Sequence, residues 1–432
     1  MKKPIIGFLA GLGLLAVLGA GTARAECKIC LGASFEGFGY WSHVDQVGGA
    51  TLTASGTRAQ QFFAELPVFN GGTMVPLNVG NISTGGGDTD FGAYAGLLAL
   101  NGVAAVSEHV DLVFRFAFIG TGYTGAGGIS PATGDPPAPG GSLAVILEQG
   151  YVDAHTADGT LGLTGGRFEP RTGRSFRQFD TGSPFLSIAR TRLLPTFLTG
   201  GTAYWNSGEL GAALYLYNDL NGVNVQDDVD MGYGAGLFYD TDALQSGITA
   251  FLSPERITLG LVDQDNELWV FILNGTAKYS EDALRAWADL TWRRDGHPSE
   301  AIQSGEAFSA EVGGAFDVTD ELGVGMGVSL SGSWTRVMDT TTAAGTGVGH
   351  LEISGITIQS AFVRDGDIFT LTPAIVFKFA DRARANIGWN LESMDGQGSN
   401  ELRRNIHTIF LSFAAEVENG TKHRANGLRP VD

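Results

Sequence analysis

The chain has 432 residues and 64 glycines; 10% of its residues are aromatic and only 17% are charged. Its formal net charge of −19 gives no support to a role in binding nucleic acid or an anionic lipid surface. A soluble domain usually carries about 25% charged residues, so this composition is unusual for a protein that is surrounded only by water.

Residues 1–25 have the pattern of a secretory signal peptide. Two lysines precede an apolar run over residues 5–20, and an Ala-Arg-Ala cleavage site ends at Ala25. The alternative is a retained membrane anchor. We expect a mature chain that begins at Glu26, and it contains no further apolar run of the ~20 residues that a spanning helix requires. Such a chain can cross a membrane only as a closed β-barrel, because every backbone polar group must be paired there.

The only two cysteines, Cys27 and Cys30, lie in a short segment at the expected mature N-terminus, residues 26–32. We expect this segment to lie on the periplasmic side, where a small disulfide loop is the usual outcome. A redox pair or a metal-binding pair is the alternative. The motif lacks the histidine needed for covalent haem attachment, and two thiols without nearby histidines make a poor zinc site.

The first half of the chain predicts strands that are separated by long connections. The residues from 45 to 89 are polar and too numerous for an ordinary connection, so we expect an external loop or a partial plug. Residues 122–142 are rich in proline and glycine and predict a second loop. The strands expected in this half are residues 33–44, 90–100, 109–121, 143–155 and 161–168.

In the second half, strands and turns alternate at regular intervals. Leu284, Leu290 and Trp292 share one face of their segment, whereas Arg285 and Asp289 lie on the other. A soluble sandwich would bury the apolar face. Segments of ~10–13 residues and aromatic residues at their ends favour contact with lipid instead. These aromatic residues are Tyr40, Trp41, Tyr204, Trp205, Trp269, Tyr279, Trp292, Trp334 and Trp389.

The connections also alternate between short and long, which is typical of a barrel with periplasmic turns and external loops. We therefore predict an all-β, transmembrane, antiparallel up-and-down β-barrel over residues 33–418, followed by a polar tail at 419–432. The pattern gives seventeen candidate strands, and bacterial barrels have an even number. We predict 16 strands, with 18 as the alternative, and expect one piece of residues 351–379 to belong to a loop.

The third long loop, residues 171–195, lies in a basic stretch of an otherwise acidic chain. We interpret it as a loop that folds into the barrel and narrows the pore. A solvated basic loop, or arginines that pair with wall carboxylates for structure, is the alternative. The predicted constriction residues are Arg167, Arg171, Arg174, Arg177, Asp180, Arg190 and Arg192. The predicted pore-wall residues are Arg285, Asp289, Glu311 and Asp317.

The run from residue 147 to residue 176 resembles the β-barrel porin-2 (OmpL-like) family of Gram-negative bacteria. The matching positions are Glu148, Gln149, Tyr151, Val152, Gly166, Arg167, Phe168 and Gly173, and residues 217–222 are similar to the family's Asn-Gly loop. The resemblance implies a water-filled channel for the passive diffusion of small hydrophilic solutes. The chain departs from such barrels at its end, because Phe413 lies well upstream of the terminus.

These features predict an integral protein of the outer membrane that contacts lipid, lipopolysaccharide and the barrel assembly machinery. A homotrimer is common for this architecture. Because arginine keeps its charge, we expect small anions to be favoured near the constriction. We expect no catalytic residue, metal or cofactor, since the seven histidines are scattered. A sheath for an electron-transfer cytochrome is one alternative function, and a barrel enzyme is another.

Overall fold

The computed structural model describes residues 29–47, 88–120, 143–172, 193–195, 197–218, 231–256, 267–296, 305–319, 325–338, 349–353, 356–360, 365–380, 383–397 and 402–417. The predicted signal peptide, Cys27 and the predicted polar tail lie outside these residues. Among the described residues, no helix has the length and apolar character needed to cross a membrane.

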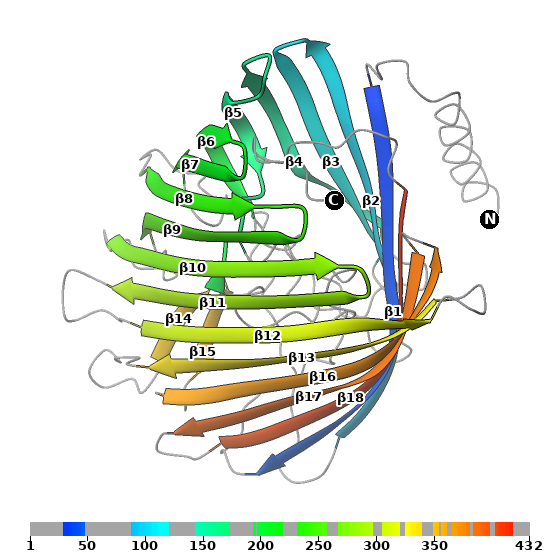
Figure 1. Ribbon diagram of the computed structural model, residues 1–432. Coiled ribbons are helices and arrows are strands. Elements are labelled where there is room, and N and C mark those ends of the chain that lie inside the picture. Colours follow the sequence, from blue (N-terminus) through cyan, green and yellow to red (C-terminus); the bar gives the residue numbers. More distant parts are fainter. Residues whose placement is uncertain are drawn as a thin grey trace.

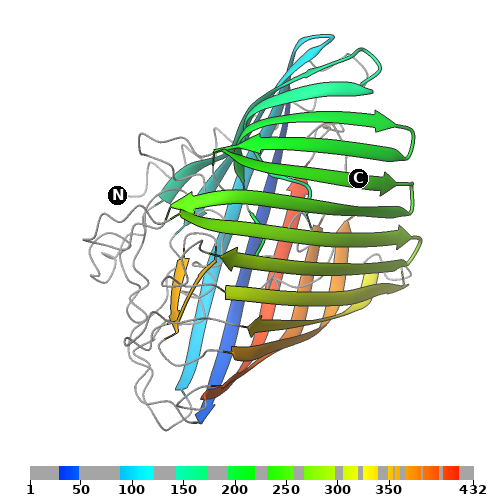
Figure 2. The same cartoon turned by 90° about the vertical axis from the view of Figure 1, so that its left-hand side faces the viewer.

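Sixteen antiparallel strands form a closed barrel, and each strand pairs with its neighbours in up-and-down order (Figures 1 and 2). The first strand pairs with the last, so the ladder has no free edge. This confirms the predicted fold class and strand number. The barrel strands are β1 (Ile29–Val47), β2 (Asp88–Ser107), β3 (Val110–Gly120), β4 (Leu143–His155), β5 (Leu161–Phe168), β6 (Leu198–Ser207), β7 (Leu210–Tyr217), β8 (Gly232–Asp240), β9 (Leu244–Arg256), β10 (Glu267–Glu281), β11 (Leu284–Gly296), β12 (Gly305–Thr319), β13 (Gly325–Met338), β16 (Asp365–Ala380), β17 (Ala383–Gln397) and β18 (Leu402–Val417).

Two further strands, β14 (Gly349–Ile353) and β15 (Ile356–Ser360), pair only with each other. They lie in the connection between β13 and β16, so the extra candidate strand belongs to a loop, as expected. The Asp-Gly-Asp sequence at residues 365–367 has the composition of a turn but does not form one. Gly366 and Asp367 instead extend β16, because their backbones pair with the end of β13.

Strand β1 begins earlier than its alternating pattern indicates. Cys30 is already in the ladder, where its Cα partner is Val103 of β2. The segment 26–32 is therefore not wholly outside the barrel, which corrects the predicted boundary. The sequence from Asn101 to Ser107 does not alternate clearly, yet β2 runs through it. The long hairpin satisfies the backbone of β1 over these extra residues.

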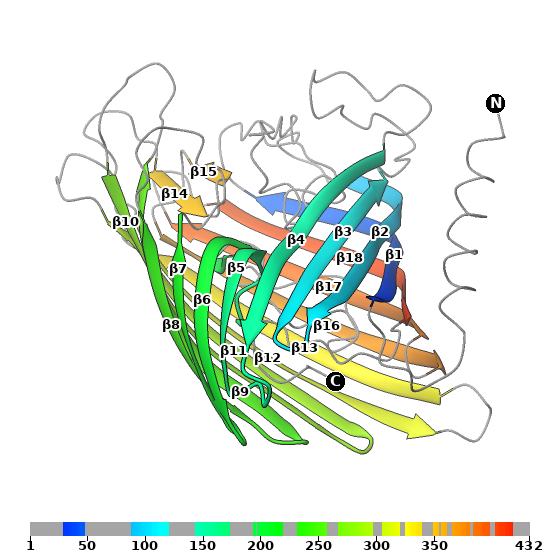
Figure 3. The ribbon, with the colours of Figure 1, turned by 90° about the horizontal axis from the view of Figure 1, so that it is seen from above.

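The two faces of each strand differ as the sequence predicts. On β11 and β12, Leu290 and Val312 point outward with exposed fractions of 52% and 62%, whereas Asp289 and Ser309 point inward and are fully buried. The barrel therefore has an apolar outer face and an inner face with many polar side chains. The strands surround an interior that is seen from above in Figure 3.

Two belts of aromatic side chains encircle much of the outer face. We call the end of the barrel with long connections the loop side and the end with short connections the turn side. On β10, Phe271 and Tyr279 mark the two belts and are eight positions apart, which is about 27 Å along the strand and about 20 Å along the membrane normal after a tilt of ~40°. This height is close to the ~25 Å apolar band of membrane barrels. The loop-side belt contains Phe271, Trp292, Phe308, Trp334 and Trp389, and the turn-side belt contains Trp205, Tyr239 and Tyr279.

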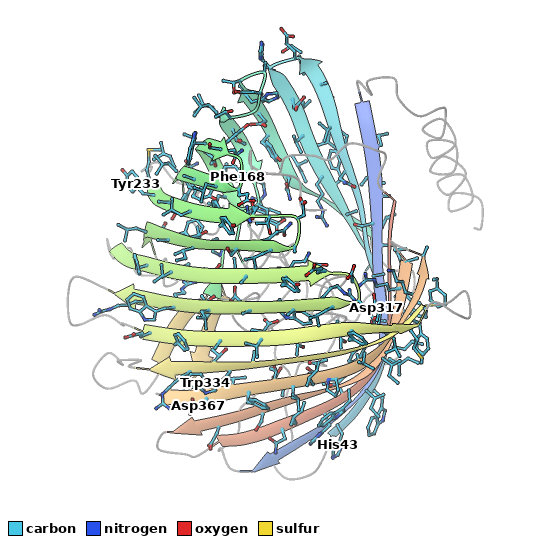
Figure 4. The ribbon with its side chains drawn as sticks, viewed as in Figure 1. His43, Phe168, Tyr233, Asp317, Trp334 and Asp367 are labelled. Atoms are coloured by element: carbon cyan, nitrogen blue, oxygen red, sulfur yellow. The ribbon has the colours of Figure 1, made fainter. Side chains whose placement is uncertain are left out.

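Tyr204 is an exception to the predicted belt. Its side chain is 3% exposed and points inward, where its hydroxyl donates a hydrogen bond to Asp153 at 3.0 Å. The sequence placed it beside Trp205, but neighbouring residues on a strand face opposite sides. At the loop side, Trp334 points outward as predicted, and its indole nitrogen donates to Asp367 at 3.0 Å (Figure 4).

Many glycines in the wall lie beneath aromatic rings. A Cβ atom added to Gly232 would come within 2.1 Å of the Tyr217 ring, and one added to Gly313 would come within 2.1 Å of the Trp287 ring. These rings can therefore lie flat against the neighbouring strand instead of projecting into the interior. Part of the high glycine content follows from this packing.

The turn between β4 and β5 has the conformation that its composition predicts. Gly159 has a φ of 65°, which an L-residue rarely adopts. Hydrogen bonds from the Thr156 hydroxyl and the Thr160 backbone N–H lower the pKa of Asp158 to about 2. The charged carboxylate therefore stabilises this turn.

Candidate functional site

The chain enters the interior of the barrel directly after β5. The backbone carbonyl of Arg171 accepts a hydrogen bond from the Thr249 hydroxyl of β9 at 3.0 Å. The Arg171 guanidinium donates to Asp240 of β8, with one contact at 2.6 Å, and lies 4.6 Å from the centre of the Phe238 ring. Since β6 and β7 separate β5 from β8, this segment passes across the inner faces of both strands.

The other described parts of this connection also lie against the wall. Glu169 accepts a hydrogen bond at 3.3 Å from Gln149 of β4. Leu193 and Leu194, at the returning end, are fully buried. Both ends of the third long connection therefore follow the inner wall, as an inward-folded loop predicts.

An apolar cluster of the inner wall holds these ends. Phe168 and Tyr215 lie with ring centres 6.2 Å apart, and Tyr215 and Phe251 are 5.6 Å apart. Leu194 of the returning end belongs to the same cluster. We call this surface the apolar wall; it contains Phe168, Leu194, Leu198, Tyr215, Tyr217, Phe238, Phe251, Val270 and Ile272. In Figure 4, Phe168 lies on the part of the barrel that β5 to β8 form.

The opposite part of the inner face is lined by hydroxyl and amide side chains. Ser309 and Thr335 are hydrogen-bonded at 2.7 Å, and Ser333 and Thr370 at 2.6 Å. These pairs link β12, β13 and β16 in register. We call this surface the polar wall; it contains Ser309, Ser333, Thr335, Thr370, Thr372, Asn386, Asn390, Thr408 and Ser412.

The structure tests the predicted constriction residues at two positions. Arg171 lies inside the barrel, as described above. Arg167 lies on the same face of β5 as Leu161 and Leu163, which point outward. Its guanidinium lies 5.2 Å from the centre of the Phe197 ring. It therefore does not join Arg171 on the inner face. The other predicted members, Arg174, Arg177, Asp180, Arg190 and Arg192, lie outside the described residues and stay a prediction.

The predicted wall carboxylates have partners within the wall. Asp289 is fully buried and accepts hydrogen bonds from Asn274 at 2.7 Å and from Thr291 at 2.9 Å. Glu311 is 5% exposed and accepts a hydrogen bond at 3.1 Å from the indole nitrogen of Trp287. Each carboxylate is thus held by a neighbouring strand.

Asp317 and Arg285 are brought together, with a nitrogen–oxygen distance of 3.1 Å, and Lys378 lies 4.0 Å from the same carboxylate. The carboxylate that meets the loop is instead Asp240, which the sequence analysis did not select. Asp240 is two positions after Phe238 on β8, so the alternating pattern could have placed it on the inner face. Nothing in the sequence indicates that it pairs with Arg171.

Known channel structures share this architecture. The outer-membrane channel DcaP of Acinetobacter baumannii superposes with a TM-score of 0.54 and 9% identity, over 91% of this chain and 99% of that one. OmpF of Salmonella typhi, in complex with daunomycin, gives a TM-score of 0.50 and 10% identity, over 89% of this chain and 97% of that one. The fold is therefore that of the outer-membrane porins.

No family model matches this sequence, and no curated protein matches it. Identities near 10% show the fold alone. The particular porin-2 resemblance stays a prediction.

Proposed function

We propose that the protein is a porin of the outer membrane, through which small hydrophilic solutes diffuse passively. The observation that carries this proposal is the opposite polarity of the two faces. Leucines such as Leu163, Leu214 and Leu237 point outward with exposed fractions of 63% to 69%. The inner face presents hydroxyl, amide and charged groups that can replace part of a solute's hydration.

Reconstitution tests this function directly. The purified barrel, inserted into a planar bilayer, should carry an ohmic ion current, and proteoliposomes should swell in small sugars. A correctly folded barrel that carries no current and admits no solute would contradict the proposal. The proposal contains no chemical step, so hydrolytic activity of the purified barrel would also contradict it.

The finer proposal concerns ion selectivity. The stretch 161–195 carries six arginines against two acidic residues, and the described ends of its loop lie on the inner wall. We propose that this loop favours small anions locally, since guanidinium groups stay charged. The reversal potential in a salt gradient should show an anion preference that weakens in Arg174→Ala/Arg177→Ala.

A matched control is Arg336→Ala, because Arg336 pairs with Asp367 at 3.1 Å on the outer face, outside the pore. It should leave the reversal potential unchanged. A firm cation preference that is the same in the wild type and in the double variant would contradict an arginine constriction.

The proposal also includes the partners expected of such a barrel: lipid, lipopolysaccharide, the assembly machinery and a homotrimer. Size-exclusion chromatography with light scattering in detergent measures the oligomer, for which we propose three copies. A sheath for a cytochrome would need a wider interior than sixteen strands provide. Haem that co-purifies with the barrel would nevertheless favour that role.

A further inference from the structure

Basic side chains gather on the inner face of the barrel, at the turn-side ends of β10 to β17. Their positions follow the alternation of the buried inward residues on the same strands, such as Asn274 on β10 and Val376 on β16. We call this group the basic patch; it contains Lys278, Arg285, Lys378 and Arg384. All four residues are half-buried, and the Lys378 side chain is 32% exposed, so the patch is accessible from the interior.

The carboxylate of Asp317 on β12 lies between two members of the basic patch (Figure 4). One oxygen is 3.1 Å from Arg285 of β11, and the other is 4.0 Å from Lys378 of β16. The strand between β12 and β16 is β13, whose inward positions at this end are Gly325 and Gly327. A Cβ atom added to Gly327 would come within 2.8 Å of the Asp317 carboxylate. The missing side chains on β13 therefore allow Asp317 to reach β16.

Lys378 and Arg384 bring two positive charges to directly opposite positions. They are Cα partners on β16 and β17, and both lie on the inner face. The Cβ atoms of such partners are about 4.5–5.5 Å apart, and like charges at this spacing are destabilising. An anion between the two side chains would remove this repulsion.

Positive charge exceeds negative charge at this end of the inner face. Among the described strand residues here, Asp317 is the acidic inward residue that accompanies the basic patch. The register also places Glu36 of β1 two strands away from Arg384, with Ala414 of β18 between them. Even with Glu36 included, four basic residues stand against two acidic ones. This part of an acidic chain therefore attracts anions.

The opposite side of the barrel has acidic residues at its turn-side end. In the closed ring, β3 and β4 lie opposite β11 and β12. Asp111 of β3 lies 3.4 Å from His155, and Asp153 of β4 accepts a hydrogen bond from Tyr204 at 3.0 Å. A small anion that enters at the turn side is therefore repelled from one side and attracted to the basic patch on the other.

The chemistry of the basic patch fits anions with two negative charges. Arginine presents a planar fork of donors that matches phosphate and carboxylate oxygens, and lysine adds a compact charge. A doubly charged anion interacts with both Lys378 and Arg384. Because water reaches these side chains, their attraction is screened and binding stays weak enough for release, as conduction requires. By contrast, Arg293 of the same inner face is 3% exposed and is not accessible to a solute.

We propose that the basic patch is a transient binding site for small, doubly charged anions such as inorganic phosphate, centred between Lys378 and Arg384. This rests on the proposed channel function and adds a solute class to it. The site is separate from the third long connection, whose described ends lie on the apolar wall and approach β8 and β9.

Inhibition of the chloride current by inorganic phosphate tests the site in a planar bilayer, under mildly alkaline conditions that keep phosphate doubly charged. Phosphate should reduce the wild-type current in a saturable manner. In Lys378→Gln/Arg384→Gln, the phosphate concentration that gives half inhibition should rise about tenfold, because charge-assisted hydrogen bonds are lost. The single variant Lys378→Gln should give a smaller rise and serves if the double variant does not fold.

The matched control is Arg294→Gln/Arg336→Gln, which removes two positive charges from the outer face. It should leave the half-inhibiting concentration unchanged. A wild-type current that phosphate does not reduce would overturn the proposal, as would equal half-inhibiting concentrations in the wild type and Lys378→Gln/Arg384→Gln.

A second measurement separates this site from the arginines of the third long connection. Arg174→Ala/Arg177→Ala should alter the reversal potential but keep the saturable inhibition by phosphate. Inhibition that is lost in this variant and retained in Lys378→Gln/Arg384→Gln would assign phosphate binding to the loop and overturn the proposal.

Failure of the channel function would be recognised separately, as a wild type that carries no current. Phosphate binding would then be measured as an increase in the free energy of unfolding in detergent, at an ionic strength kept constant with chloride. A larger increase in the wild type than in Lys378→Gln/Arg384→Gln would support the site without the channel. Equal increases in both proteins would overturn it.

Discussion

The apolar wall and the polar wall belong to one closed sheet but have different tasks. The apolar wall packs the Phe238 ring against Arg171 at the start of the third long connection and includes Leu194 from its returning end. The polar wall pairs small side chains with one another, as Ser309 and Thr335 do. One side of the barrel therefore holds a loop by apolar burial, whereas the other side is stabilised by hydrogen bonds between neighbouring strands.

Truncation in the apolar wall should have the largest effect on stability. Phe251 is 1% exposed and contacts both Tyr215 and Tyr217, so Phe251→Ala should lower the free energy of unfolding by about 3–5 kcal/mol. The free energy of unfolding can be measured by urea denaturation in detergent, with Trp fluorescence as the readout. Ser412→Ala on the polar wall is the control, with an expected change below ~1.5 kcal/mol. Equal losses in both variants would remove the distinction between the walls.

The next largest effect on stability is expected at the ion pair between Arg171 of the loop and Asp240 of the wall. Asp240→Asn leaves the Arg171 guanidinium buried without its carboxylate, and should cost about 2–3 kcal/mol. The released loop should also raise the single-channel current. Arg171→Met/Asp240→Leu, which removes both charges, should recover part of the stability but keep the higher current. A current unchanged in both variants would show that this pair does not hold the loop.

Hydrogen bonds of the polar wall should matter less. Thr335→Val leaves the Ser309 hydroxyl buried beside a methyl group, which should cost about 1–2 kcal/mol. Removing both hydroxyls in Ser309→Ala/Thr335→Val should cost no more than the single change. A double-mutant cycle on the free energy of unfolding measures the coupling, and strict additivity would argue against the pair.

The smallest effect lies outside both walls, in the turn between β4 and β5. The folded state lowers the pKa of Asp158 from 3.8 to about 2. The charged carboxylate therefore contributes fully to the stability of the protein above pH ~4, and this contribution is lost as the pH falls toward 2. Asp158→Asn should therefore show a weaker loss of stability over this window than the wild type. Thr156→Val, which removes the hydroxyl that donates to Asp158, should shift the wild-type loss to higher pH. Identical pH profiles for all three chains would contradict this account.

Local patterns in the sequence predicted most of the barrel. The alternation of Leu290 and Asp289 predicted both faces correctly, and the bounds of β4 and β5 are as expected. The pairing of Arg171 with Asp240 could not be predicted, because 69 residues separate them and only closure of the barrel brings them together. The early start of β1 was missed for a related reason, since pairing with β2 rather than its own pattern extends it.

The central claim is that the outer face contacts lipid while the inner face contacts water. Leu330 and Ser331 are neighbours on β13; Leu330 points outward with 53% exposure, and Ser331 points inward. Leu330→Cys and Ser331→Cys, each made after both native cysteines are replaced by serine, can be treated in bilayers with a charged, membrane-impermeant thiol reagent. The account predicts modification of Ser331→Cys with a fall in current, and no modification of Leu330→Cys. Rapid modification of Leu330→Cys together with an inert Ser331→Cys would contradict it.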